Sequence, residues 1–239
     1  MLSRIATLKP LTAARALRKL FANPDETEHV FEIIDALQGP TLLRTRDRLA
    51  STPEGRRLLD TRPTMLPLLC DREGLRQLPA GSLGRAYLDF VDAEGITADG
   101  LVEASNRARE DRADELMWIK TWLRDTHDLW HTVLGYQGDL IGEAALLAFS
   151  HANTKNIGVG MIAAAAWFKL GRVTAAEVDA RATIAEGRRL AKNAAWFIAV
   201  PWHEWLARPL EDVRRDLRIV RPVEYQPVRT EEVDVSLVA

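Results

Sequence analysis

Apolar residues recur every three or four positions along most of the chain, which is the spacing that gathers them on one face of an α-helix. The pattern starts at Leu11, Ala14, Leu17 and Leu20. It resumes behind Asn23-Pro24-Asp25-Glu26, where a capping residue, a proline and two acids are typical of a helix start. We find no stretch with the period of two expected of a strand. The sequence therefore predicts an all-α protein.

The same periodicity predicts a succession of further helices. One follows Pro40, one opens at Pro53, one runs from Ser82 to Gly95, and one starts near Thr97 or Asp99. A long helix is expected from Asp111 to about Leu134, a second from about Asp139, and a third over the Ala-rich stretch to Leu170. The next runs from the Thr174-Ala-Ala-Glu177 capping box to about Asn193, and short helices begin at Pro201 and Pro209.

Two regions depart from this pattern. Residues 62–80 contain Pro63, Pro67 and Pro79, so we predict a linker with at most short turns. After Arg218 the chain is rich in Pro, Val and Glu, and we expect it to be extended or poorly ordered. The predicted architecture is a single-domain multi-helix bundle over residues 1–220 with a C-terminal tail over 221–239.

Composition narrows the class of protein. Of 239 residues, 47% are hydrophobic and 28% charged, and the formal net charge is −2. This balance is typical of a globular chain and lacks the basic excess expected of a nucleic-acid-binding protein. The single cysteine, Cys70, excludes an internal disulfide and a Cys-rich zinc module. We expect it to be a buried structural thiol.

The location is predicted from two segments. The longest apolar run, Gly158 to Phe168, is far short of the ~20 residues that span a bilayer. Residues 1–20 bear Arg and Lys without acids, as a mitochondrial transit peptide does, but a helical pattern from Leu11 leaves little length to cleave. We expect a bacterial cytoplasmic protein. Attraction of Arg15, Arg18 and Lys19 to the inner-membrane surface stays open beside a simple solvated face.

The candidate chemistry lies between His127 and Glu143. His127 and His131 are four residues apart, so on a helix both imidazoles lie on one face, one turn apart, as a shared metal ion requires. Asp128 is placed to bind the ion directly or to orient a ligand, and Glu143 is the remote carboxylate candidate.

Geometry sets a condition on that site. In one straight helix, His131 and Glu143 would be about 18 Å apart, whereas ligand atoms lie about 2 Å from the metal. The chain must therefore turn between them. Gly135 and Gly138 supply a break, and Gly142 lets a second helix approach closely.

A histidine pair at this spacing also occurs without a metal ion, because His-x-x-x-His pairs arise by chance on surfaces and in cores. The motif also differs from the His-Glu-x-x-His of zinc proteases, because Asp128 occupies the position of the general base, which disfavours a peptidase. A generic metal-dependent hydrolase remains an alternative.

At these residues the chain resembles a known family. His127-Asp128-x-x-His131 followed by Glu143 resembles the signature of the ubiquinone (coenzyme Q) biosynthesis protein 4 family. The similarity covers roughly residues 10–220 and includes the helix start at Asn23, the block from Leu78 through Arg85, Tyr87 and Phe90, the turn at Leu134-Gly135 and Gly142, and the C-terminal region from Trp202 to Ile219.

The resemblance implies an all-helical fold and a role in ubiquinone biosynthesis. By position, His127, Asp128, His131 and Glu143 would be ligands of a divalent metal ion (Zn, Fe, Mg or similar). The implied partners are a prenylated quinone precursor or other polyprenyl lipid and other ubiquinone biosynthesis proteins, with a membrane surface and a second copy of the chain as further candidates. Two roles follow, oxidative decarboxylation at ring carbon 1 or a non-catalytic lipid-binding scaffold.

Several other residues are further candidates for binding or structural roles. Arg85 and Tyr87 are candidates to contact an anionic head group, with helix packing as the alternative. We expect His151 to cap a helix or lie on the surface, and His29 and His203 to be structural or solvent-facing. The tryptophan pairs Trp118/Trp122 and Trp202/Trp205 are expected to pack in the core.

Overall fold

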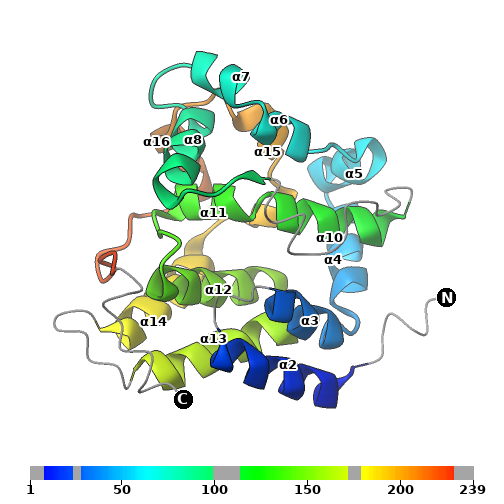
Figure 1. Cartoon of the computed structure of the whole chain (residues 1–239). Helices are drawn as coiled ribbons and strands as arrows, with labels where there is room; N and C mark the ends of the chain where they lie inside the picture. Colours follow the sequence, from blue (N-terminus) through cyan, green and yellow to red (C-terminus); the bar gives the residue numbers. More distant parts are fainter. Residues whose placement is uncertain (1–7, 24–27, 99–113, 172–178, 229–239) are drawn as a thin grey trace. The chain divides into compact units, whose positions relative to one another are not determined.

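The computed structural model describes residues 8–23, 28–98, 114–171 and 179–228. Within them it contains helices and no strand, so the predicted all-α class is confirmed (Figure 1). The helices are α2 Pro10–Ala22, α3 Glu28–Ala36, α4 Thr41–Ala50, α5 Pro53–Thr61, α6 Leu66–Cys70, α7 Arg72–Gln77, α8 Leu83–Glu94, α10 Glu115–Asp125, α11 His127–Leu134, α12 Leu140–Thr154, α13 Ile157–Leu170, α14 Ala180–Asn193, the 3-10 turn η1 Phe197–Ala199, α15 Trp202–Trp205 and α16 Leu210–Leu217.

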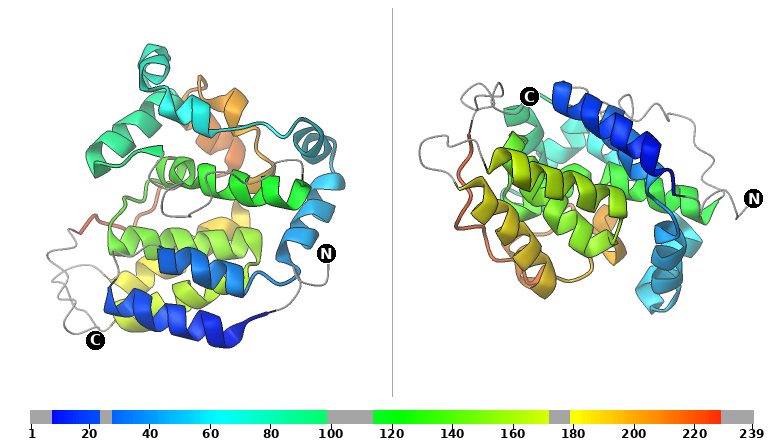
Figure 2. Two further views of the ribbon diagram at one scale, coloured as in Figure 1. Left: turned by 45° about the vertical axis from the view of Figure 1, so that its right-hand side comes forward. Right: turned by 90° about the horizontal axis from the view of Figure 1, so that it is seen from below.

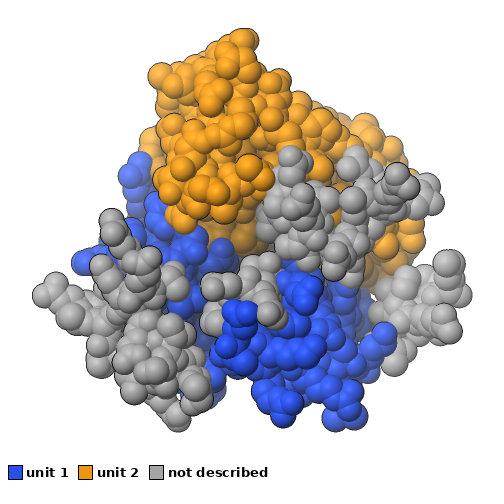
Figure 3. All heavy atoms as spheres, viewed as in Figure 1, with its two compact units in different colours: residues 1–41, 136–193, 221–239 blue, residues 42–135, 194–220 orange. Residues whose placement is uncertain are grey.

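The chain divides into two compact units, coloured separately in Figure 3. Unit 1 comprises residues 1–41, 136–193 and 221–239, and unit 2 comprises residues 42–135 and 194–220. The described part of the predicted tail, residues 221–228, is non-helical and belongs to unit 1. The single-domain boundary at residue 220 stays a prediction.

The predicted linker over residues 62–80 is wrong, because α6 and α7 form there. Pro67 lies in the first turn of α6, where the N–H that proline lacks would have no partner within the helix. Asp71 caps α7 by accepting from the Gly74 N–H at 2.9 Å. Pro67 therefore starts a short helix instead of excluding one.

The predicted long helix to Leu134 is also wrong, because it breaks at Thr126 into α10 and α11. The Thr126 hydroxyl donates to the Trp122 carbonyl at 2.8 Å, and its backbone leaves the helical region. His127 is consequently the first residue of a new helix. The expected starts near Asp99 and at the Thr174 capping box, and most of the start at Asn23, lie outside the described residues.

Two smaller expectations are corrected. The buried face of α2 is Ala13, Ala16 and Leu20, while Leu11 is exposed, so the apolar stripe is rotated from the predicted one. Cys70 is exposed rather than buried, because it ends the short helix α6.

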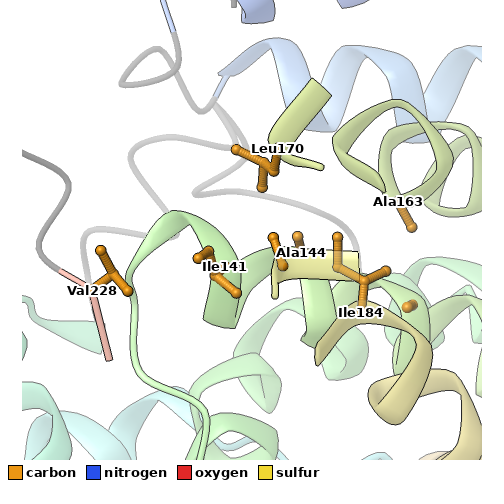
Figure 4. Close-up of a cluster of buried hydrophobic side chains, with 8 residues drawn as sticks. Ile141, Ala144, Ala163, Leu170, Ile184 and Val228 are labelled. Carbon is orange, nitrogen blue, oxygen red and sulfur yellow. The ribbon is translucent and has the colours of Figure 1, made fainter. Parts of the chain in front are cut away.

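Unit 1 is built on the packing of α12 against α13 and α14, which lie side by side in Figures 1 and 2. Ile141 and Ala144 of α12 meet Ile184 of α14 in an apolar cluster (Figure 4). The helices approach closely because Gly187 has no side chain, and a Cβ there would lie 2.2 Å from the Ala145 carbonyl oxygen.

In unit 2, α11 packs against α8 and α16. Arg214 of α16 is buried, and its guanidinium donates to the carbonyls of Val133 at 2.8 Å and Thr132 at 3.0 Å. These are among the last carbonyls of α11, which have no partner within the helix. Arg214 therefore anchors the C-terminal end of the helix that carries the two histidines.

No helix within the described ranges is both long and apolar enough to span a bilayer. The finding agrees with the short apolar run seen in the sequence.

Gly187→Ala is expected to destabilise the protein by about 1–3 kcal/mol, as overpacking of a core does. The clash is with backbone, which moves less easily than a side chain, so it outweighs the ~1 kcal/mol that alanine gains over glycine in a helix. Urea unfolding measures the change. Ala185→Ser, on the exposed face of the same helix, is the matched control and should change stability by less than about 0.5 kcal/mol. A stabilised G187A protein would contradict the close packing.

Arg214→Met is expected to cost about 2–4 kcal/mol, because it removes buried donors and leaves two carbonyls of α11 unsatisfied. The control is Arg215→Met on the same helix, since the Arg215 side chain is 70% exposed and its ion pair with Asp212 contributes little. Thermal unfolding of both variants provides the comparison. Equal stability of the two variants would show that Arg214 does not anchor α11.

Candidate metal centre

The two histidines occupy one face of α11. His127 and His131 have ring centroids 4.9 Å apart. His131 is 1% exposed, and its ring stacks on Phe90 of α8 with centroids 5.3 Å apart. The stacking holds the imidazole plane in one orientation, as a metal ligand requires. The predicted pairing of the histidines is confirmed.

Asp128 contacts the ring of its neighbour. Its carboxylate Oδ1 lies 3.1 Å from His127 Nδ1, and the side chain is buried. A carboxylate beside Nδ1 favours the tautomer with its proton there, which leaves the Nε2 lone pair for a metal. Between the two roles predicted for Asp128, this contact supports orientation of His127. Direct ligation by Asp128 stays a prediction.

The predicted turn follows α11. Gly135 ends the helix with a φ of +86°, a conformation that favours glycine. Asp139 then caps α12, its Oδ1 accepting from the N–H groups of Ile141 and Gly142 at 3.0 Å each. Gly142 fits because a Cβ there would lie 2.2 Å from the Gln137 carbonyl oxygen. This places Glu143 in the first turn of α12.

His127, His131 and Glu143 together form a group that could hold a metal ion. Each offers one ligand atom, and these atoms all lie within 4.8 Å of one another. Atoms that each lie about 2 Å from a common ion are separated by no more than about 4 Å, so small side-chain adjustments suffice. All three come from the continuous stretch 127–143, so the group depends on the local turn. Two imidazoles and a carboxylate are a donor set that suits Zn, Fe and related ions.

The other predicted site residues lie in contacts of the fold. Arg85 donates to the Arg76 carbonyl of α7 at 2.5 Å, and Tyr87 is fully buried. These contacts agree with the packing alternative. Binding of a head group by Arg85 and Tyr87 stays a prediction.

The remaining histidines are structural, as expected. His151 Nδ1 lies 2.8 Å from the Asn156 carbonyl oxygen at the end of α12. His29 is buried beside Glu32 at 3.5 Å. His203 packs edge-on against Trp122, and burial lowers the pKa of its imidazole. The core role expected of the tryptophan pairs is confirmed for Trp118 and Trp122, which are buried and stacked.

Sequence reasoning missed two residues that support the site. Arg214 anchors α11, and the Tyr225 hydroxyl donates to the Asp139 carboxylate. Both lie more than eighty positions from their partners. Helical periodicity reports only near neighbours, so it contained no signal for them.

Beside the turn, Tyr136 is buried, and burial together with Glu186 raises the pKa of its phenol above the ordinary value. The group therefore stays neutral at physiological pH.

A solved structure shares the fold. It is a putative ubiquinone biosynthesis protein from Nostoc punctiforme, with a TM-score of 0.67 and 23% identity, covering 88% of this chain and 98% of that one.

Curated relatives are also named as ubiquinone biosynthesis proteins. The ubiquinone biosynthesis protein coq4, mitochondrial, of Sclerotinia sclerotiorum is 30% identical over 89% of this chain and 73% of its own length. The corresponding protein of Yarrowia lipolytica is 31% identical over 79% of this chain and 70% of its own length.

These names correct the expected location. The sequence predicts a bacterial cytoplasmic protein, with the inner membrane as a peripheral contact, whereas the curated relatives are named as mitochondrial proteins. The prediction rests on the early start of the helical pattern at Leu11. That observation says nothing about the compartment. The solved neighbour comes from a bacterium.

The family model of the coenzyme Q (ubiquinone) biosynthesis protein Coq4 matches residues 5–223. This match includes α11, the turn and the start of α12, and it confirms the resemblance first seen at His127 to Glu143. The chain belongs to the Coq4 family of ubiquinone biosynthesis proteins.

Proposed function

We propose that this protein binds one divalent metal ion through His127, His131 and Glu143 and uses it to act on the aromatic head group of a prenylated benzoate precursor of ubiquinone. The reaction proposed is oxidative decarboxylation at ring carbon 1. The observation that carries the proposal is the grouping of the three ligand atoms within 4.8 Å. Membership of a ubiquinone biosynthesis family supports the substrate class.

The donor set suits an anionic head group. Two neutral imidazoles and one carboxylate leave a divalent ion with a net positive charge and with coordination positions still open. An ion held this way supplies an electrophile for the carboxylate or phenolate of the precursor. Phe90 and Asp128 keep the two imidazoles oriented, so that the ligand set is ordered before substrate arrives.

The overall reaction balances with dioxygen as oxidant. The bond between ring carbon 1 and its carboxyl group breaks and releases carbon dioxide, and a hydroxyl group forms at that carbon. Dioxygen supplies the hydroxyl oxygen. Its second oxygen leaves as water, which requires a two-electron reductant and two protons.

The lipid part of the proposal needs apolar surface for a prenyl tail. Helix α13 supports it, because Ile157 is 49% exposed and Phe168 59% exposed. Other enzymes of ubiquinone biosynthesis are the proposed protein partners, since they make the precursor and consume the product.

We expect purified wild-type protein to contain about one divalent ion per chain. The double variant H127A/H131A should lose it, since two of the three ligands are gone, and E143Q should bind it more weakly. Elemental analysis measures the content. His203→Gln, which alters a histidine on α15, is the control and should keep the ion. Full occupancy in the double variant would disprove the assignment of the site.

Turnover is tested with a prenylated 4-hydroxybenzoate, dioxygen and a chemical reductant, using protein loaded with Fe²⁺ or Zn²⁺ in parallel. We expect release of carbon dioxide from the wild type and none from H127A/H131A. Tight binding of the precursor without carbon dioxide release would contradict the enzymatic proposal and support a lipid-binding scaffold. Cleavage of esters or amides without lipid binding would support a hydrolase instead.

A further inference from the structure

The C-terminal segment 221–228, here called the strap, is hydrogen-bonded to α14. The backbone N–H groups of Val223 and Glu224 donate to the two carboxylate oxygens of Glu186 at 3.1 Å each. Glu186 is 3% exposed, so these bonds are shielded from water. The Thr183 hydroxyl donates to the Glu224 carbonyl at 3.1 Å. The strap is thus fixed at its middle by two residues of one helix.

Tyr225 extends from the strap to the turn before α12. Its hydroxyl accepts from the Gln137 N–H at 3.0 Å and donates to Oδ2 of Asp139. Its ring packs edge-on against Tyr136 with centroids 5.2 Å apart. Val228, three residues further along, joins the apolar cluster of Ile141 (Figure 4).

Asp139 links the Tyr225 hydroxyl to the first turn of α12. While Oδ2 binds Tyr225, Oδ1 accepts from the N–H groups of Ile141 and Gly142. The Asp139 carbonyl accepts from the Glu143 N–H at 2.8 Å. Asp139 therefore connects the Tyr225 hydroxyl to the backbone of the carboxylate ligand.

There is little room for this arrangement to shift. A Cβ at Gly142 would lie 3.1 Å from the Tyr225 hydroxyl and 2.2 Å from the Gln137 carbonyl oxygen. The phenol thus packs directly on the backbone of the residue before Glu143. A metal ligand has to be held to about 0.5 Å, and contacts of this kind provide such restraint.

We propose that Tyr225 is a positioning residue of the metal centre, which acts through Asp139 to hold the start of α12 and with it the Glu143 carboxylate. This inference rests on the proposed function of His127, His131 and Glu143. Tyr225 lies outside residues 5–223 that the family model matches.

The test compares Tyr225→Phe with Thr183→Val in the full-length protein. Y225F removes only the hydroxyl that binds Asp139, and T183V removes a hydroxyl that binds the strap at a distance from Asp139. Titration with Co²⁺, followed by its visible absorption spectrum, measures affinity and ligand geometry. We expect Y225F to bind Co²⁺ about 10-fold more weakly with an altered spectrum, as loss of a supporting contact typically causes. T183V should lower the melting temperature but keep Co²⁺ affinity within about twofold of the wild type.

A double-mutant cycle with Asp139→Ser sharpens the result. Serine still caps a helix but is too short to reach both α12 and the phenol. If Tyr225 acts through Asp139, the Y225F/D139S protein binds Co²⁺ no more weakly than D139S alone. Additive losses would overturn the proposal.

Two further outcomes separate this inference from the proposed function. Failure of the wild type to bind Co²⁺ would contradict the metal site itself. Wild-type binding with unchanged affinity and spectrum in Y225F would contradict only the role of Tyr225. A Y225F protein that loses its fold would overturn the inference too, because the hydroxyl would then be a requirement of folding.

Discussion

The reversal of the chain between α11 and α12 is the constraint on which the candidate site depends. A helix advances about 1.5 Å per residue, so a histidine pair and a carboxylate twelve positions further on meet only if the helix stops and turns back. Gly135 permits the stop with its positive φ, and Asp139 starts the next helix by accepting from its first free N–H groups. Glu143 then falls in the first turn, within 4.8 Å of the histidine ligand atoms.

Contacts around the turn hold α11 and the start of α12 in place. Arg214 binds the carbonyl end of α11, Phe90 stacks on His131, and Asp128 contacts the His127 ring. On the other side of the turn, Asp139 binds both the backbone of α12 and the phenol of Tyr225. The candidate ligands are therefore held by contacts that involve residues from distant parts of the sequence. Such contacts would order the three side chains for the metal ion that we propose.

Much of this could be predicted from the sequence. The helix boundaries at Ser82, Gly95, Asp139 and Leu170 follow local rules of capping and periodicity, and so do the histidine pair and its glycine turn. The errors have physical causes. Pro67 lies in the first turn of the short helix α6, and the backbone leaves the helical conformation at Thr126 within an unbroken apolar pattern. The contacts of Arg214 and Tyr225 are set by tertiary packing, which no local pattern reports.

The family relationship and the geometry of the candidate site support different parts of the proposed function. Membership in the Coq4 family places the protein in ubiquinone biosynthesis. The three converging ligands supply a physical reason for the chemistry proposed, because an electrophilic ion is well suited to an aromatic carboxylate. The most direct measurement is a crystal structure of the Co²⁺-soaked protein with diffraction collected at the cobalt absorption edge. We expect one anomalous peak about 2.0–2.2 Å from a ring nitrogen of His127, a ring nitrogen of His131 and a carboxylate oxygen of Glu143. A fully occupied peak elsewhere, with none at these residues, would contradict the proposed metal site.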